Sequence, residues 1–264
     1  THTLKYRNII VIQEDYTTTK AEGGYPLYFH HTSNFNYNVL DYKFNYKHVI
    51  TPISIALNVQ QSNDFVKTCI TANYSYNFQK KNKGVDVRFF AGVLGFDNSS
   101  FPITPKFQVS GIKGNEIGWN QDYLFDNIYL DRSGSNELLS RQFAEQDGGF
   151  KYYWTASSSK WLASLCVKSS LGNAKIPLNF YGEVCTMGFD ELYFTSGFKN
   201  RYLYDAGIYL SLPKHIFEIY FPLIVCNDFQ EYEKEKEINF LQRTRFTLNL
   251  NLVNPFELLK QINL

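Results

Sequence analysis

The sequence predicts an all-β fold, a transmembrane antiparallel β-barrel of about twelve strands. Three observations favour this class. Runs of alternating apolar and polar residues recur along most of the chain, and no long helical pattern interrupts them. Many of these runs reach about nine residues, which suits a tilted membrane span. Aromatic residues are abundant, with 20 Tyr and 23 Phe, and a membrane barrel places such residues at both interfaces.

The clearest alternation lies in the last quarter of the chain. In residues 244–252 the even positions from 246 onward hold Phe and Leu, whereas the odd positions hold Arg, Thr and Asn. Residues 201–212 alternate in the same way, and residues 215–225 form a third run. Because successive side chains of a strand point to opposite faces, each run has one apolar and one polar face. This pattern fits a soluble sheet over a core, or a barrel with lipid outside and polar groups in the lumen.

The expected strands follow one another at short intervals. They span residues 3–14, 36–50, 53–61, 65–79, 85–96, 107–111, 150–155, 161–168, 176–184, 201–212, 215–225 and 244–252. The last strand is expected to close the barrel by pairing with the first. Residues 15–35 and 226–241 are expected to be loops, although residues 25–29 could extend a strand.

The domain boundaries follow from this pattern. The barrel is expected to cover residues 1–253, and residues 254–264 are expected to form a short amphipathic tail, with Asn254 as a helix N-cap. Residues 113–147 do not alternate, so we expect them to fold into the lumen or onto the periplasmic mouth. In an even-stranded barrel the short turns are periplasmic and the long loops external, and on this strand count residues 113–147 are the exception. A barrel is favoured over a soluble sandwich because the apolar face continues from strand to strand.

The polar faces of the strands predict the lining of the barrel. The residues expected to face the lumen are Asp41, Lys43, Lys47, Lys67, Asp86, Arg88, Lys151, Lys168, Glu183, Arg201, Asp205, Glu218 and Arg245. Acids and bases interleave in this set. They are expected either to line an open pore or to form a salt-bridged plug, and the plug is favoured because a barrel of about twelve strands lies between the filled and the open sizes.

Several strings of residues resemble one family. Residues 122–127 (DYLFDN), 139–143 (LSRQF), 147–151 (DGGFK) and 245–251 (RFTLNLN) are similar to the C-terminal barrel region of Bacteroidetes proteins of the aminopeptidase-N (gluzincin) type. The resemblance covers about the last two thirds of the chain. It implies a barrel that follows a peptidase domain. Because the sequence has no His-Glu-x-x-His motif, no zinc site is expected, and the chain would be the membrane part without the enzyme.

The remaining motifs carry little chemistry. His30 and His31 beside Ser33 are the only cluster worth testing for hydrolysis, and no triad spacing is visible, so no catalytic residue is assigned. The four cysteines match no metal or redox spacing and are expected to be buried or lumen-facing thiols; no metal or cofactor is expected. The near-neutral net charge gives no indication of nucleic-acid binding. Residues 1–7 carry no signal-peptide pattern, so an exported chain would be processed, or a piece of a longer one.

These observations together predict a barrel of the cell outer membrane. Its expected role is a membrane anchor, or a passage, for an associated peptidase-like domain. The expected partners are outer-membrane lipid, the barrel assembly machinery, and a periplasmic or surface protein. A small-solute channel, a barrel-embedded hydrolase and a soluble β-sandwich binding protein remain as alternatives.

Overall fold

The computed structural model describes residues 1–20, 26–78, 83–95, 105–113, 121–133, 138–152, 156–170, 178–188, 202–211 and 216–249, and for residues 13–20, 26–31, 33, 113 and 178 only the backbone. It confirms the all-β class. The described helices are short, and none is long and apolar enough to cross a membrane.

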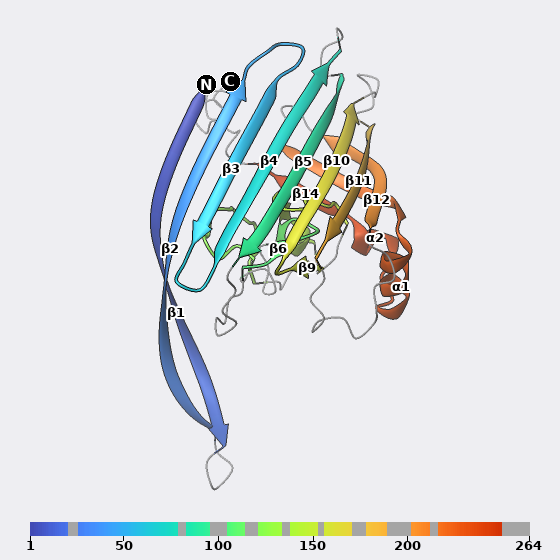
Figure 1. Ribbon diagram of the computed structural model, residues 1–264. Coiled ribbons are helices and arrows are strands. Elements are labelled where there is room, and N and C mark those ends of the chain that lie inside the picture. Colours follow the sequence, from blue (N-terminus) through green and yellow to red (C-terminus); the bar gives the residue numbers. More distant parts are fainter. Residues whose placement is uncertain are drawn as a thin grey trace, which may run out of the picture.

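One large sheet organises the described chain. Its ten strands, in spatial order, are β1 (His2–Lys20), β2 (Pro26–Tyr46), β3 (Ile53–Gln61), β4 (Val66–Asn77), β5 (Gly84–Gly95), β10 (Trp161–Ser170), β11 (Leu178–Met187), β12 (Leu203–Ser211), β13 (Phe217–Val225) and β14 (Arg245–Leu248). Neighbouring strands are antiparallel throughout. The sheet curls, so that the C-terminal strands lie behind the middle strands in Figure 1.

The convex face of the sheet is apolar and exposed. One row of neighbours across four strands is Phe89, Leu165, Val184 and Tyr204, and these side chains are 38–46 % exposed. Such rows repeat along the sheet, because most outward positions of its strands hold Val, Leu, Ile, Phe, Tyr or Ala. Asn8 of β1 and Asn36 and Asn38 of β2 form a polar interruption near one edge. We call this surface the apolar belt.

The concave face is polar at one end and apolar at the other. On β5 the inward side chains run from Leu94 and Phe90 to Arg88 and Asp86, and on β10 from Leu162 to Lys168. The apolar ends of these strands join a core that includes Phe107 and Tyr152. The concave face is therefore divided into an apolar zone and a charged zone.

The connection between β5 and β10, residues 96–160, supplies the filling of the concave face. In its described parts it contains β6 (Phe107–Gln108), β7 (Ile112–Lys113), the 3-10 turn η2 (Leu139–Arg141), β8 (Phe143–Ala144) and β9 (Ser157–Ser158). Two small sheets join β6 with β9 and β7 with β8. We call this connection the inserted segment. Its sequence does not alternate because it packs against the concave face and forms no strand of the large sheet.

Two short helices cover the apolar zone. α1 (Asn227–Glu235) packs Phe229 face to face on Tyr152 of the inserted segment, with ring centroids 4.3 Å apart. α2 (Phe240–Arg243) begins with a capping box, in which Asn239 and Gln242 satisfy each other's backbone N–H groups. α1 lies at one end of the curled sheet, opposite to the N-terminus in Figure 1.

Several sequence predictions are wrong. Residues 15–35 are not a loop in the described chain, because β1 and β2 continue as one long hairpin beyond the other strands (Figure 1). Residues 226–241, also expected to be a loop, hold α1 and the beginning of α2. The expected strands at 107–111 and 150–155 belong to the inserted segment: the first is only two residues long, and described residues 150–152 form no strand. The wall therefore has ten strands, not about twelve, in the described residues.

With the corrected strand count, residues 113–147 no longer form a long connection at the end of the sheet that carries the short turns. With β5 as the fifth strand of the wall, the inserted segment leaves the sheet at the same end as residues 226–244, which also form a long connection. Short turns such as 47–52 lie at the other end. Within the described residues β1 pairs with β2 alone and β14 pairs in the sheet with β13 alone, so the structure shows a curled sheet.

Candidate functional site: an ion-pair network between the sheet and the inserted segment

A glycine turn docks the inserted segment onto the middle of the sheet. Arg88 of β5 donates to the carbonyl oxygen of Asp147 at 2.8 Å, and the Lys67 ammonium of β4 lies 3.7 Å from the Asp147 carboxylate. Asp147 and Gly149 have positive φ angles of 50° and 70°. A Cβ atom on Gly148 would lie 2.4 Å from the carbonyl oxygen of Val109. The Asp-Gly-Gly string is thus required by close backbone approach.

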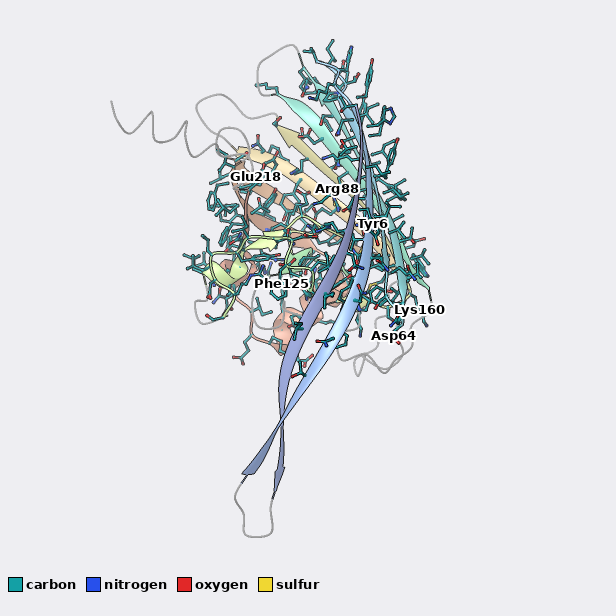
Figure 2. The ribbon with its side chains drawn as sticks, turned by 90° about the vertical axis from the view of Figure 1, so that its left-hand side faces the viewer. Tyr6, Asp64, Arg88, Phe125, Lys160 and Glu218 are labelled. Atoms are coloured by element: carbon teal, nitrogen blue, oxygen red, sulfur yellow. The ribbon has the colours of Figure 1, made fainter. Side chains whose placement is uncertain are left out.

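A chain of alternating charges continues from this turn. Lys151 is fully buried, and its ammonium lies 2.6 Å from Glu183 of β11 and 2.8 Å from Glu145. Glu145 also lies 3.3 Å from the ammonium of Lys168 on β10, which in turn is 3.5 Å from Glu218 on β13. Figure 2 shows Arg88 and Glu218 among the side chains of this interior. Because an isolated buried charge is costly, each member of this charge network requires its neighbours.

The position of Glu145 has a consequence for its ionisation. Burial disfavours its carboxylate, but the Lys151 and Lys168 ammonium groups outweigh that effect and lower the pKa of Glu145 well below its ordinary value of 4.5. Glu145 is therefore the ionised centre of the network at neutral pH.

Ion pairs and hydrogen bonds also tie the inserted segment to both edges of the sheet. Arg7 of β1 donates to Asp126 at 2.9 Å and to Asp41 of β2 at 3.3 Å. At the other edge, buried Arg245 of β14 donates to the carbonyl oxygen of Ser110 at 2.8 Å. Its guanidinium also lies over the ring of Phe143, 4.2 Å from the ring centroid. The segment thus spans the space between the two edge strands.

Three hollows surround Glu145 in the charged zone. Their volumes are about 410, 460 and 510 Å³, and Glu145 lines all three. Arg88 lines two of them, and Lys168 lines two. The apolar zone is closed instead: Tyr152 donates to Glu233 of α1 at 2.8 Å, and Arg243 of α2 pairs with Glu233 at 2.6 Å. The site is thus a set of polar hollows above a sealed core.

The residues predicted to face the lumen are distributed as follows. The concave face carries Lys67, Arg88, Glu183, Asp205, Glu218 and Arg245, all buried, together with Asp41, Asp86 and Lys168, which are half-buried, and Lys43, which is exposed. Lys151 lies in the inserted segment, not on a strand, because residues 150–152 are part of the filling. Lys47 follows β2 in an exposed turn and is outside the network. Arg201 lies outside the described residues.

The structure adds functional residues that the sequence prediction missed. Glu145, Asp147 and Asp126 stand in the non-alternating segment, where periodicity assigns no face. Arg7 stands in an expected strand, and its odd position beside Ile9 and Val11 was the available signal. The cysteines are free thiols; Cys166, Cys185 and Cys226 are buried and Cys69 is half-buried. His30, His31 and Ser33 lie on the backbone of β2, and their side chains are outside the description.

The described residues contain no group of three or more His, Cys, Asp or Glu placed to hold a metal ion. No known protein family matches the sequence, and no curated protein matches it either. The resemblance to the barrel region of gluzincin-type proteins therefore stays a prediction.

The first prediction concerns the buried pair of Lys151 and Glu183. Lys151→Met leaves two carboxylates without their shared cation, so we expect unfolding to become easier by about 3–5 kcal/mol. Lys236→Met is the matched control, because Lys236 pairs with Glu235 on the exposed surface and should change stability by less than about 1 kcal/mol. Chemical denaturation of both variants measures the difference. Equal effects would contradict the importance of the buried pair.

A second prediction follows from the lowered pKa of Glu145. The ionised form stabilises the folded state above the ordinary pKa of 4.5, and this contribution declines as the pH falls below it, because the unfolded state then takes up the proton first. The stability difference between wild type and Glu145→Gln should be constant from neutral pH to about pH 5 and shrink below that. Unfolding curves at a series of pH values test this. A difference that does not change with pH would argue against the network.

Proposed function

We propose that the ten-stranded sheet forms the wall of an outer-membrane β-barrel, with the inserted segment in its lumen. We propose further that this barrel serves as a membrane anchor or passage for an associated domain. One observation carries the proposal. The sheet exposes its apolar face and buries its charged face, as the row of Phe89 and Leu165 outside and the pair of Lys151 and Glu183 inside illustrate. A bilayer is the solvent that this inverted arrangement fits.

The dimensions of the strands support a membrane span. β4 and β5 have 12 residues each. At about 3.3 Å per residue such a strand is about 40 Å long, which crosses a hydrocarbon core of about 30 Å when the strand is tilted. β4 and β5 thus have the length that the proposal needs.

Aromatic residues at the two ends of the belt add further support. Tyr46, Tyr74 and Tyr76 are exposed near the end with the short turns, and Trp161 and Tyr202 are exposed near the opposite end. Aromatic rings favour the interfaces of a bilayer, where one side of the ring is apolar and the other is wet.

The filling favours an anchor over an open pore. The apolar zone is sealed by the core and the helices, and the charged zone is bridged by Glu145 and Lys151. Small-solute passage is a second candidate, favoured by the three hollows that share Glu145. The peptidase-like partner rests on the sequence resemblance alone. A soluble sandwich fits poorly, since it would bury the apolar face.

The membrane setting is tested by a charge placed on the belt. Leu165→Arg should destabilise the folded protein in bilayers by about 2–4 kcal/mol, because an arginine at the middle of the lipid face must leave water. Val49→Arg, in the exposed turn between β2 and β3, is the control and should have little effect. Folding into lipid vesicles, followed by the mobility of unheated protein on gels, measures both. If the two variants fold equally well, the belt does not face lipid.

Conductance separates the anchor from the passage. A barrel whose lumen is plugged should show no ion current in planar bilayers, because the charge network bridges the charged zone. The double variant Lys67→Ala with Glu145→Ala removes ties between the inserted segment and the sheet, and it should show intermittent current. Lys236→Ala is the control outside the site and should stay silent. Steady current through the wild-type protein would favour the passage.

A further inference from the structure

Two buried acids lie directly opposite each other on neighbouring strands. Glu183 of β11 and Asp205 of β12 are partners in the antiparallel register, and the two strands run side by side in Figure 1. Residues opposite each other in such a pair have Cβ atoms about 5 Å apart on the same face of the sheet. On the concave face, Glu183 is 5 % exposed and Asp205 is 1 % exposed. Two ionised carboxylates at this separation, away from water, repel each other.

The contacts of Glu183 fit an ionised carboxylate. Its Oε2 atom accepts a hydrogen bond from the backbone N–H of Lys151 at 2.8 Å, and its Oε1 atom lies 2.6 Å from the Lys151 ammonium. Both of its oxygens thus act as acceptors, as those of an ionised carboxylate do. The Lys151 ammonium also pairs with Glu145 at 2.8 Å. This one cation is therefore already shared between two carboxylates.

The contacts of Asp205 do not fit an ionised carboxylate. Among the described residues Asp205 forms no ion pair, and its Oδ1 atom is buried without a hydrogen-bond donor. Its Oδ2 atom accepts from the hydroxyl of Tyr181 at the long distance of 3.4 Å. A buried negative charge with so little compensation is strongly unfavourable, whereas a neutral carboxyl group in the same place is not.

One proton resolves both difficulties. The carboxyl groups of Asp205 and Glu183 lie within hydrogen-bonding range of each other. A proton on Oδ1 of Asp205 turns that atom into a donor, and the Glu183 carboxylate becomes its acceptor. The repulsion between the two acids is then replaced by a hydrogen bond to a charged group, which is among the stronger kinds in proteins.

A proton fits this position better than a metal ion does. The Lys151 ammonium beside Glu183 would repel a metal cation, and the described residues hold no group of three or more His, Cys, Asp or Glu that could bind one. The other titratable groups around Asp205 in the described chain are Tyr181 and Cys185 of β11, and β13 places Val225 opposite it. None of these side chains supplies a positive charge.

We propose that Glu183 and Asp205 form an acid pair that binds one proton in the folded protein at neutral pH. Asp205 carries the proton and donates it in a hydrogen bond, and Glu183 is the ionised acceptor. The proton thus takes the place of a side-chain cation at this point of the charge network. It joins β11 to β12 and leaves the Lys151 ammonium to hold Glu183 and Glu145. This site does not depend on whether the apolar belt faces lipid.

Infrared spectroscopy of the folded protein at neutral pH tests the acid pair. The wild type should show the C=O stretching band of a protonated carboxyl group, and Asp205→Asn should lose it. Asp86→Asn is the matched control, because Asp86 also lies on the concave face but stands opposite Lys168. That variant should keep the band. A wild type without the band, or a folded Asp205→Asn variant that retains it, would overturn the proposal.

Isotope labelling assigns the proton without any variant. In wild-type protein with ¹³C at the aspartate carboxyl carbons, the band should move to lower frequency. A band that does not move belongs to a glutamate, and it would overturn Asp205 as the member of the pair that carries the proton.

The pH dependence of stability gives an independent measure. Above about pH 5 the unfolded chain has released this proton, since an ordinary Asp has a pKa of about 3.9, whereas the folded wild type keeps it. The stability of the wild type relative to Asp205→Asn should therefore fall as the pH rises, by up to about tenfold in the folding equilibrium constant per pH unit. For Asp86→Asn the difference should stay constant from about pH 5 to pH 8. Unfolding curves across this range measure both, and a constant difference for Asp205→Asn contradicts a bound proton.

Discussion

The structure depends on one constraint: charges that leave water must be paired within the protein. The concave face carries Glu183, Lys67 and Lys168, and strand pairing alone gives them few partners of opposite charge. The inserted segment supplies those partners through Glu145, Asp147 and Lys151. Removing one member leaves another as a buried unpaired ion, which costs more than the pair contributes. The network therefore holds the segment in one position against the sheet, since any displacement separates several pairs at once.

Different forces hold the inserted segment in the two zones of the concave face. Near Leu162 and Phe90 the segment is held by apolar burial, with Phe107 fully buried among aromatic rings. Near Lys168 it is held by charge pairs and keeps polar hollows. Apolar packing tolerates no voids of this size without loss of stability, whereas polar hollows can hold water. The position of the hollows thus follows from which residues line each strand.

Much of the wall could be predicted from the sequence, because a strand has a period of two. The parity of Leu165 and Glu183 assigns them to opposite faces, and the structure places them so. The filling could not be predicted in this way. Glu145 directly precedes a turn in which Asp147 and Gly149 have positive φ angles, so no strand period applies there. The strand partners of Glu145 and Asp147 are Lys168 and Lys67, which lie far away in the sequence. Lys151 stands between Phe150 and Tyr152, so this part of the inserted segment has the alternation of a strand in the sequence without forming one.

The helix α1 and the long hairpin were missed for local reasons. The run from Glu231 to Glu237 looked like a solvated loop, yet Glu and Lys favour helix, and Phe229 gives that helix an apolar anchor. Residues 15–35 contain Gly and several His and Thr residues, which suggested a loop, although Thr and Tyr also favour strands. For α1 the deciding contact is tertiary, the stacking of Phe229 on Tyr152. For the hairpin it is the pairing of β1 with β2.

The place of the inserted segment in the chain shapes how the sheet forms. Strands β1 to β5 and strands β10 to β14 are each joined by neighbours in sequence, so either half can assemble from local hairpins. The pairing of β5 with β10, as in Phe89 with Leu165, must wait until residues 96–160 have been brought back between them. Closing so long a loop is an entropic barrier. The slow step of assembly is therefore expected at this central joint.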